Sequence, residues 1–355
     1  MKNYNPSIGY LKALGIMLMV LGHSGNSLHI NYFVCMFHMP LFFIASGYCF
    51  KPKYLDAPKQ YLYNKVKGIW WPYVKWGLLF LLLHNLFFQL NLYNDQYGYH
   101  GAVSHPYSFY GIYHTAFAIV TRMQGAEQLL GGYWFLNALF FGSLIAWLVI
   151  RFVKNTLIGG GILLCLCTIL NKTCWHLPFF GISSQAFAAA LLILIGYAMA
   201  KYQLKPFKGW QIVLGLAFTL LGSFGWLMAM NQDSYSNKCF VPYILSASIA
   251  TWCFYSLFER MKETQGVVAK ALEFIGKHTL TILTWHFLAF KIVSLLIIQI
   301  YDLPIERLAE FPVILEYSSQ GWWIAYFLVA MVVTCGISYV CNGLYMILKF
   351  KERLK

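Results

Sequence analysis

The stretch Ile8-Gly-Tyr-Leu-Lys12-Ala-Leu-Gly-Ile-Met-Leu-Met-Val-Leu-Gly-His23-Ser24 is apolar enough to cross a membrane as a helix, yet it carries two ionisable residues. Lys12 and His23 are eleven residues apart, so at ~100° per residue they lie on nearly one face, ~16 Å apart along the axis. A membrane-spanning helix needs ~20 apolar residues, so at least one of the two side chains lies in the hydrocarbon. An ionisable residue there is costly and marks a functional site.

The composition of the whole chain is that of a protein that crosses the bilayer many times. Of the 355 residues 59% are hydrophobic and 11% are charged, and the mean hydropathy is +0.59. We predict an all-α, polytopic membrane bundle that forms one domain over residues 1–355, because no linker or low-complexity tract divides the chain. The first apolar segment lacks a cleavage site and is expected to be retained.

Ten apolar stretches are long enough to cross a hydrocarbon core. The expected spans are 8–28, 31–50, 73–92, 132–150, 156–171, 184–200, 209–230, 242–258, 279–300 and 322–348. With the N-terminus inside, most of the 26 Lys and Arg residues fall on the inner side, and the exceptions are Arg122, Lys172, Lys238, Arg307 and, within a span, Lys291. This bias predicts that both termini face the cytoplasm in a bacterial inner membrane. It also explains the net charge of +14 as a topological signal, so no nucleic-acid partner is expected.

The nine cysteines form no CxxC pair and have no metal-ligand spacing with histidine, so we expect no metal centre. Cys174 and Cys239 both fall in expected outer loops. They form a disulfide if that side is oxidising, or they are two loop cysteines without a bond, and both alternatives stay open.

Further motifs follow the first span. Phe37-His38-Met39-Pro40-Leu41-Phe42-Phe43-Ile44-Ala45-Ser46-Gly47-Tyr48 comes after Lys12-x10-His23. Together these resemble the membrane-bound acyltransferase-3 family, whose members carry an Arg/Lys-x10-His first helix and an F-H-x-P-L-F-F-x-x-S-G second helix. Further matches are Lys65-Val-Lys67-Gly-Ile-Trp-Trp-Pro72-Tyr73, Gly132-Tyr133-Trp134-Phe135-Leu136, and Ile275-Gly276-Lys277-His278-Thr279-Leu280 with Trp285-His286. The resemblance covers about residues 8–290, and the chain is similar in particular to the fucose-O-acetylase-like, polysaccharide-modifying branch.

The chain departs from the family pattern at two places. An acidic residue is common three positions before the first-helix cation, where this chain has Gly9, so another group must supply that charge if the site uses it. Lys65 and Lys67 stand where arginine is common, which replaces bidentate phosphate contacts with point charges.

The resemblance implies transfer of an acyl group, usually acetyl from cytoplasmic acetyl-CoA, to a sugar hydroxyl of an envelope glycan. Lys12, Lys65 and Lys67 would then bind the donor phosphates from the inner side. The ~16 Å between Lys12 and His23 suits a pantetheine arm that lies along the first span. The alternatives are that Lys12 snorkels to the headgroups and that each loop lysine only sets topology.

A sugar hydroxyl is a poor nucleophile, so the transfer needs a general base, and histidine suits this task near pH 7. We assign this role to His23, as base or as covalent acyl carrier, and the sequence does not separate the two. His38 is the expected second histidine, because the antiparallel second span returns it to the depth of His23, with Pro40 kinking that span. The alternative for either is a satisfied hydrogen-bond partner between helices. His286 and Lys291, in one late span, also need partners.

For the acceptor sugar we assign Trp134, at the expected outer mouth of a span, and Ser46 of the second motif. The outer loop 93–131 is rich in tyrosine and histidine, which suit sugar stacking but also form interfacial belts in any membrane protein. The expected partners are acyl-CoA, an envelope carbohydrate and the lipid bilayer, and the sequence carries no signal for an oligomeric state. Two other classes stay open: a glycan or lipid-linked precursor transporter or flippase, which finds no support from an internal repeat, and a non-catalytic partner of a glycan synthase.

Overall fold

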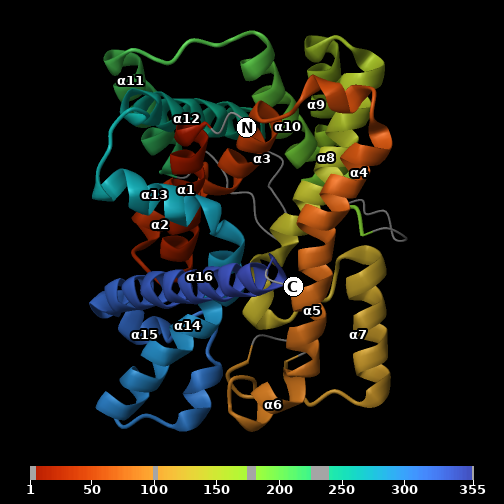
Figure 1. Cartoon of the computed structure of the whole chain (residues 1–355). Helices are drawn as coiled ribbons and strands as arrows, with labels where there is room; N and C mark the ends of the chain where they lie inside the picture. The colour runs from red at the N-terminus through yellow and green to blue at the C-terminus, as the bar shows by residue number, and fades with distance from the viewer. Residues whose placement is uncertain (1–4, 99–102, 174–180, 225–239, 354–355) are drawn as a thin grey trace.

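The computed structural model of the chain describes residues 5–98, 103–173, 181–224 and 240–353 (Figure 1). Within these ranges the chain forms helices joined by turns and loops, with no β-strand, which confirms the expected all-α class. Cys174 and Cys239 both lie outside the described residues, so their pairing stays a prediction.

Long helices alternate along the chain with short helices and helical turns. The first half of the chain forms α1 (Pro6–His23), α2 (Leu28–Cys35), α3 (His38–Tyr48), α4 (Pro58–Lys65), α5 (Trp71–Leu82), α6 (His84–Gln89), α7 (Phe109–Arg122) and α8 (Trp134–Val153). The second half forms α9 (Thr156–Thr173), α10 (Ser184–Lys201), α11 (Gly209–Ser223), α12 (Phe240–Met261), α13 (Val267–Lys277), α14 (Thr279–Ile300), α15 (Leu315–Tyr317) and α16 (Trp323–Arg353). Short π-helical turns are η2 (Val66–Trp70) and η6 (Ser318–Trp322), and 3₁₀ turns are η1 (Pro52–Leu55), η3 (Gln128–Tyr133) and η5 (Ile305–Ala309).

Among the described residues, seven stretches are long and apolar enough to cross a membrane. They are Pro6–His23, Leu28–Tyr48, Gln128–Val153, Ser184–Lys201, Phe240–Met261, Thr279–Ile300 and Leu315–Gly343. Each matches an expected span, as a polytopic membrane protein requires. The remaining three expected spans do not reach membrane-spanning length among the described residues, so about ten spans is not confirmed. α9 covers the whole of 156–171, although its described apolar part is Thr156–Leu170. α11 covers 209–223, while 225–230 lie outside the described residues, and 73–92 is divided between α5 and α6.

The second span is interrupted just before its histidine. α2 ends at Cys35, and Phe37 has a non-helical φ of −146° before His38 begins α3. Pro40 therefore lies in the first turn of α3, where its missing N–H removes no helical hydrogen bond. The expectation that Pro40 kinks the span is corrected, because the interruption precedes the proline.

Close helix crossings at glycine hold the centre of the bundle. Gly47 of α3 lies against the backbone of α10 at Ile193, and Gly196 of α10 lies against the backbone of α3, so a Cβ at either position would overlap a carbonyl oxygen. Gly276, near the end of α13, meets the backbone of Gly9 on α1 in the same way. Small residues allow this approach between helices in membranes.

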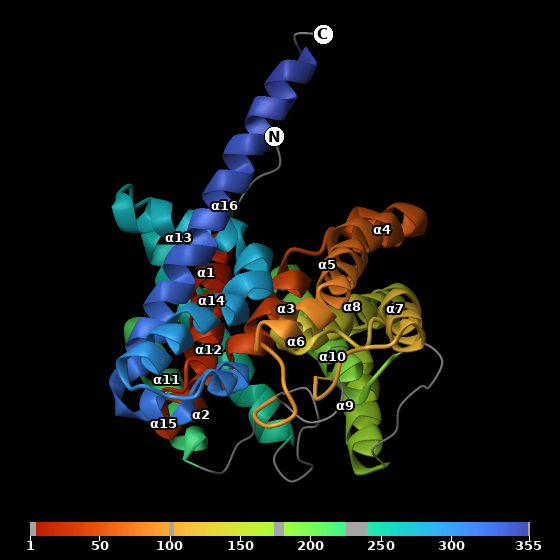
Figure 2. The ribbon, with the colours of Figure 1, turned by 90° about the horizontal axis from the view of Figure 1, so that it is seen from below.

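The start of α1, α4, α13 and the last turns of α16 lie toward one end of the molecule, and α2 and α15 lie toward the other (Figure 2). The described ends of the chain are therefore on one side, while their orientation in the membrane stays a prediction. The expected outer loop 93–131 contains a helix, α7, which packs along α5 (Figure 1). The Trp70 indole donates a hydrogen bond to the Val120 carbonyl at 3.1 Å, which places Arg122 beside the start of α5.

Candidate active site

A cavity of about 740 Å³ lies among α1, α3, α8, α14 and the π-helical turn η2. Its volume is within the range of about 300–1,000 Å³ that is usual for small-molecule sites. α1 lines it with one stripe of residues at helical spacing, which are Asn5, Ile8, Gly9, Lys12, Ile16 and Met19. The cavity therefore follows the same face of α1 that carries His23 one turn further on.

Lysines gather at the α13 end of this cavity. Lys12, Lys51 and Lys277 line it, and Lys277 pairs with Glu273 at 2.7 Å. Lys12 is half-buried, and no carboxylate or carbonyl group of the described residues pairs with its ammonium group. Holding an unpaired cation at this depth is costly, so the cavity is suited to an anionic ligand group.

Beyond Lys12 the walls of the cavity become apolar. Ile16 and Met19 of α1 face Phe135 and Leu139 of α8 and Leu283 of α14 across it. A cavity with cations at one end and apolar walls beyond them suits a ligand with an anionic head and a thin, less polar arm.

Ser46 lines this same cavity, together with its neighbours on α3. The structure therefore places Ser46, which we assigned to the acceptor, in the compartment of Lys12. Its position is set by the helical spacing from Phe42, another residue of the lining.

Three histidines from three helices lie just beyond the apolar end of the cavity, and none of them is among its lining residues. His23 follows the lining residue Met19 by four positions on α1, His286 follows Leu283 by three on α14, and His38 directly precedes Met39 on α3. Helical spacing places each of them about one turn or less from the last lining residue of its helix.

The partner of His23 is His286. The Nδ1 of His23 lies 3.2 Å from the Nε2 of His286, and the two rings are stacked with centroids 5.3 Å apart. His38 instead donates from Nδ1 to the carbonyl of Val34 at 2.9 Å, within its own span. We predicted His38 as the second histidine beside His23, but the structure gives His23 a contact with His286, which also supplies the partner that His286 needed. His38 stays a neighbouring candidate.

Aromatic rings close the far side of the histidine pair. Phe287 packs on His23 and His286 with centroids 4.8 Å and 3.9 Å away, and Phe311 packs on Phe287 at 4.6 Å. Ser318 donates a hydrogen bond to the carbonyl of Gly25 at 3.0 Å, which ties the chain after His23 to η6. The end of α1 is therefore held in place from α14 and from the segment before α16.

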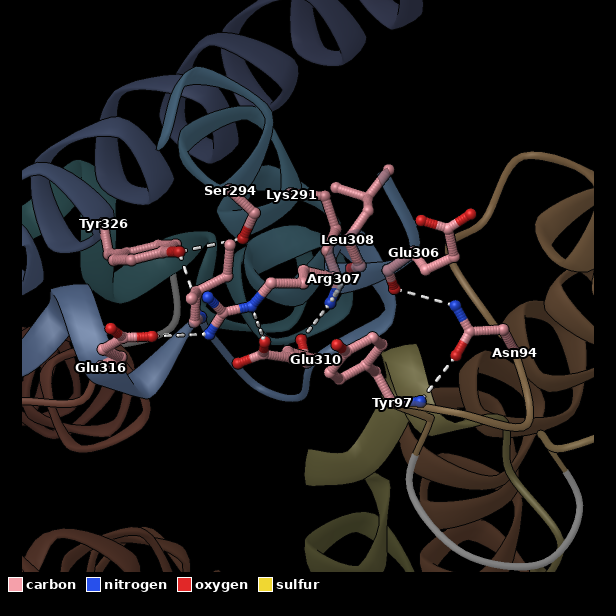
Figure 3. Close-up of polar contacts among 11 residues, drawn as sticks. Asn94, Tyr97, Lys291, Ser294, Glu306, Arg307, Leu308, Glu310, Glu316 and Tyr326 are labelled. Atoms are coloured by element: carbon pink, nitrogen blue, oxygen red, sulfur yellow. Dashed lines mark hydrogen bonds and ion pairs between the residues drawn. The ribbon is translucent and has the colours of Figure 1, made fainter. Parts of the chain in front are cut away.

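Lys291 holds the segment that carries Phe311 (Figure 3). It is 3% exposed, and its ammonium group donates to the carbonyls of Leu308 at 2.9 Å and Glu310 at 2.6 Å. Beside it Arg307 pairs with the carboxylates of Glu310 and Glu316, and these carboxylates raise the pKa of its guanidinium. Lys291 therefore acts as a structural clamp of the aromatic cover.

Lys65 and Lys67 do not line the cavity. The Lys65 ammonium donates to the Ser143 hydroxyl at 3.0 Å, and burial lowers its pKa to about 8. Lys67 is exposed and lies over the Tyr63 ring. Gly68 and Ile69 of η2, which follow Lys67 in the sequence, do line the cavity. Both lysines are therefore near lining residues in the sequence, but their side chains contact other groups.

Trp134 lies on a second cavity, of about 430 Å³. Successive helical positions place Trp134 and Asn137 on the face of α8 opposite Phe135 and Leu139 of the first cavity. No charged residue is among the described residues that line it, which include Tyr73, Trp134, Gln124, Asn137, Ser183 and Gln185. It also reaches Gly131, where an added Cβ would contact the Phe287 ring that packs on His23.

A carboxylate does approach the start of α1, although Gly9 itself carries none. The Ser7 hydroxyl donates to Glu259 of α12 at 2.7 Å. The sequence patterns did not single out Lys51 and Lys277, which line the cavity, or Glu259, which contacts α1 outside it. Lys277 stood within a family motif, and Glu259 is one of only 12 acidic residues in the chain, which is the signal that could have found it.

The fold and this site define a helical membrane protein with a cation-lined cavity that leads to paired histidines. The profile of the acyltransferase-3 family, described as an acyltransferase domain, matches residues 5–343. The chain therefore belongs to the acyltransferase-3 family and is a membrane acyltransferase, which confirms the resemblance at the level of the family. Comparison with curated proteins and with solved structures finds no match.

Proposed function

We propose that this acyltransferase moves an acetyl group from cytoplasmic acetyl-CoA to a hydroxyl of a cell-envelope sugar or polysaccharide, as a member of the fucose-O-acetylase-like branch. One observation carries the proposal. The stripe of α1 that lines the first cavity runs from Lys12, a cation without a partner among the described residues, to Met19, and His23 follows one helical turn beyond it. This arrangement fits a donor that has an anionic head and a reactive group at the end of a long arm.

The donor phosphates bind at the lysine end of the cavity. Lys12 is the principal contact, and Lys51 and Lys277 line the same end, while Lys65 and Lys67 add positive charge near η2. The pantetheine arm then lies along Ile16 and Met19, over the ~16 Å between Lys12 and His23. Ser46 offers a hydroxyl to the amide groups of that arm.

His23 acts on the thioester end of the donor. As general base it takes the proton of the acceptor hydroxyl while the oxygen attacks the acetyl carbonyl. As nucleophile it forms an acetyl-imidazole that the acceptor then attacks. His38, at the start of α3, is the second histidine at this end of the cavity and assists in positioning the reactants.

The acceptor binds in the second cavity. The described lining offers amide, hydroxyl and indole groups and no charged side chain, which suits a neutral sugar. Trp134 and Tyr73 offer ring faces, and Gln124 and Asn137 offer amides. The cavity reaches Gly131, next to the Phe287 ring that packs on His23.

The membrane orientation follows from the basic loops. With both termini cytoplasmic in a bacterial inner membrane, the lysine end of the first cavity faces the compartment that holds acetyl-CoA. α9, α11 and the α5–α6 pair complete about ten spans in this arrangement.

The proposal is tested with purified full-length protein and acetyl-CoA. We expect release of CoA in the presence of envelope polysaccharide, and a fall in kcat of at least ~100-fold in His23→Ala with donor binding retained. The control His114→Ala changes an exposed histidine of α7 and should leave kcat unchanged. Glycan movement across vesicles without consumption of acetyl-CoA would instead establish a transporter, and an active His23→Ala would overturn the assigned role.

A further inference from the structure

The direction of the hydrogen bonds around His286 is set by its own helix. Its Nδ1 lies 3.0 Å from the carbonyl of Leu283 and 3.2 Å from that of Ile282. A carbonyl oxygen only accepts, so Nδ1 carries the hydrogen. His286 is 0% exposed and its described ring neighbours besides His23 are the uncharged Phe287 and Phe290, which disfavours a second proton. Its Nε2 is therefore a hydrogen-bond acceptor.

The acceptor Nε2 of His286 determines which tautomer His23 adopts. Since the Nε2 of His286 has no hydrogen, the Nδ1 of His23, 3.2 Å away, must donate. A neutral His23 then has its free electron pair on Nε2. We propose that His286 is a positioning residue that holds His23 in this tautomer, with Nε2 ready to take a proton or to attack an acyl group. The role in catalysis rests on the proposed function, whereas the tautomer does not.

Two other histidines show why His286 is needed. His38 and His278 each direct Nδ1 to the carbonyl four positions earlier in the chain, Val34 at 2.9 Å and Phe274 at 2.7 Å, so their tautomers are set locally. His23, half-buried at the end of α1, has no such bond among the described residues. Its tautomer is set by a side chain from α14.

The reaction balances with this arrangement. The proton of the acceptor hydroxyl passes to Nε2 of His23, the hydroxyl oxygen bonds to the acetyl carbon, and the carbon–sulfur bond breaks. The leaving thiolate then takes the proton from Nε2, which yields an ester and free CoA. While His23 is an imidazolium, its Nδ1–H still donates to Nε2 of His286. In the acyl-histidine route the same free Nε2 bonds to the acetyl carbon as the carbon–sulfur bond breaks and the thiolate leaves. The acceptor oxygen then bonds to the acetyl carbon as the carbon–nitrogen bond breaks, and the hydroxyl proton passes to the thiolate, so the inference holds for both routes.

The test compares His286→Leu, which removes the acceptor, with His286→Gln, whose side-chain oxygen replaces Nε2. We expect His286→Leu to lower kcat by about 10- to 100-fold with the KM for acetyl-CoA unchanged, as for partners that orient metal-bound histidines, and His286→Gln to retain most of the activity. His114→Leu, which removes an exposed histidine of α7 outside both cavities, is the control and should leave kcat unchanged.

A spectroscopic measurement separates positioning from folding. Ring-¹⁵N NMR of the full-length protein labelled at histidine, with His23 assigned by difference from His23→Ala, should show His23 protonated at Nδ1 in the wild type and a mixture of tautomers in His286→Leu. Protonation at Nε2 in the wild type, or the same spectrum and kcat in His286→Leu, would overturn the inference. If the wild type transfers no acyl group, the proposed function fails while the spectrum still decides the tautomer.

Discussion

Lys12 and Lys291 are both lysines within apolar membrane-spanning helices, but their surroundings are opposite. Lys12 of α1 faces a cavity and has no carbonyl or carboxylate partner in the described part of the chain. Lys291 of α14 is 3% exposed and donates to two carbonyl oxygens (Figure 3). Burying a cation in the membrane costs free energy. At Lys291 hydrogen bonds to the two backbone carbonyls offset this cost, whereas at Lys12 a bound anionic ligand would have to offset it.

The difference shows how an intramembrane lysine is to be interpreted. The residue type alone indicates only that some partner is required. Where backbone carbonyls meet that requirement, as around Lys291, the lysine holds a loop to a helix. Where no protein group provides the partner and the lysine faces a cavity, as at Lys12, the lysine is a candidate contact for a ligand.

The largest effect should come from Lys12→Ala, which removes a charged contact with the donor phosphates. A hydrogen bond to a charged group is worth about 1.5–3 kcal/mol, which corresponds to a loss of roughly 10- to 100-fold in affinity for acetyl-CoA. Isothermal titration of the purified protein measures it. Lys12→Arg keeps the charge and should bind nearly as well, and an unchanged affinity in Lys12→Ala would leave Lys12 as a headgroup anchor.

Lys291→Met should lower the stability of the fold and leave donor binding unchanged, which is the reverse of the effect expected for Lys12→Ala. The carbonyls of Leu308 and Glu310 lose their donor, and a buried group left without a partner costs about 1–3 kcal/mol. We expect a lower thermal unfolding midpoint, with the affinity for acetyl-CoA unchanged in the protein that remains folded. Weaker donor binding at an unchanged unfolding midpoint would place Lys291 in the donor site and end the contrast with Lys12.

The smallest effect should come from Lys65→Met. Lys65, on α4, does not line the cavity and donates a hydrogen bond only to the hydroxyl of Ser143 among the contacts of the described residues. Burial lowers its pKa to about 8, whereas in the unfolded chain it is about 10.4. Between these values the unfolded chain binds more protons, so the burial cost of Lys65 is full below pH 8 and fades as the pH rises. Lys65→Met should therefore raise the unfolding midpoint more at pH 7 than at pH 10. A larger gain at pH 10 would contradict this sign.

Local spacing predicted much of the fold and part of the site. The hydrophobic runs predicted the seven long spans, because a helix needs only a length of apolar sequence to cross a membrane. The same-face relation of Lys12 and His23 followed from eleven positions on one helix. The division of 73–92 between α5 and α6 was not predicted, because hydropathy reports the length of an apolar run and not where a helix within it ends.

The sequence by itself determined that this protein is a helical membrane acyltransferase with Lys12 and His23 on one stripe, because helix periodicity and motif spacing are properties of a single segment. Only the tertiary structure decided that His286 contacts His23 across 263 positions, that Lys51 and Lys277 join Lys12, and that Lys65 and Ser46 lie elsewhere than expected. The physical reason is that which partner meets a buried polar group depends on how helices pack against one another, and close crossings such as Gly276 on Gly9 set that packing between segments far apart in the chain.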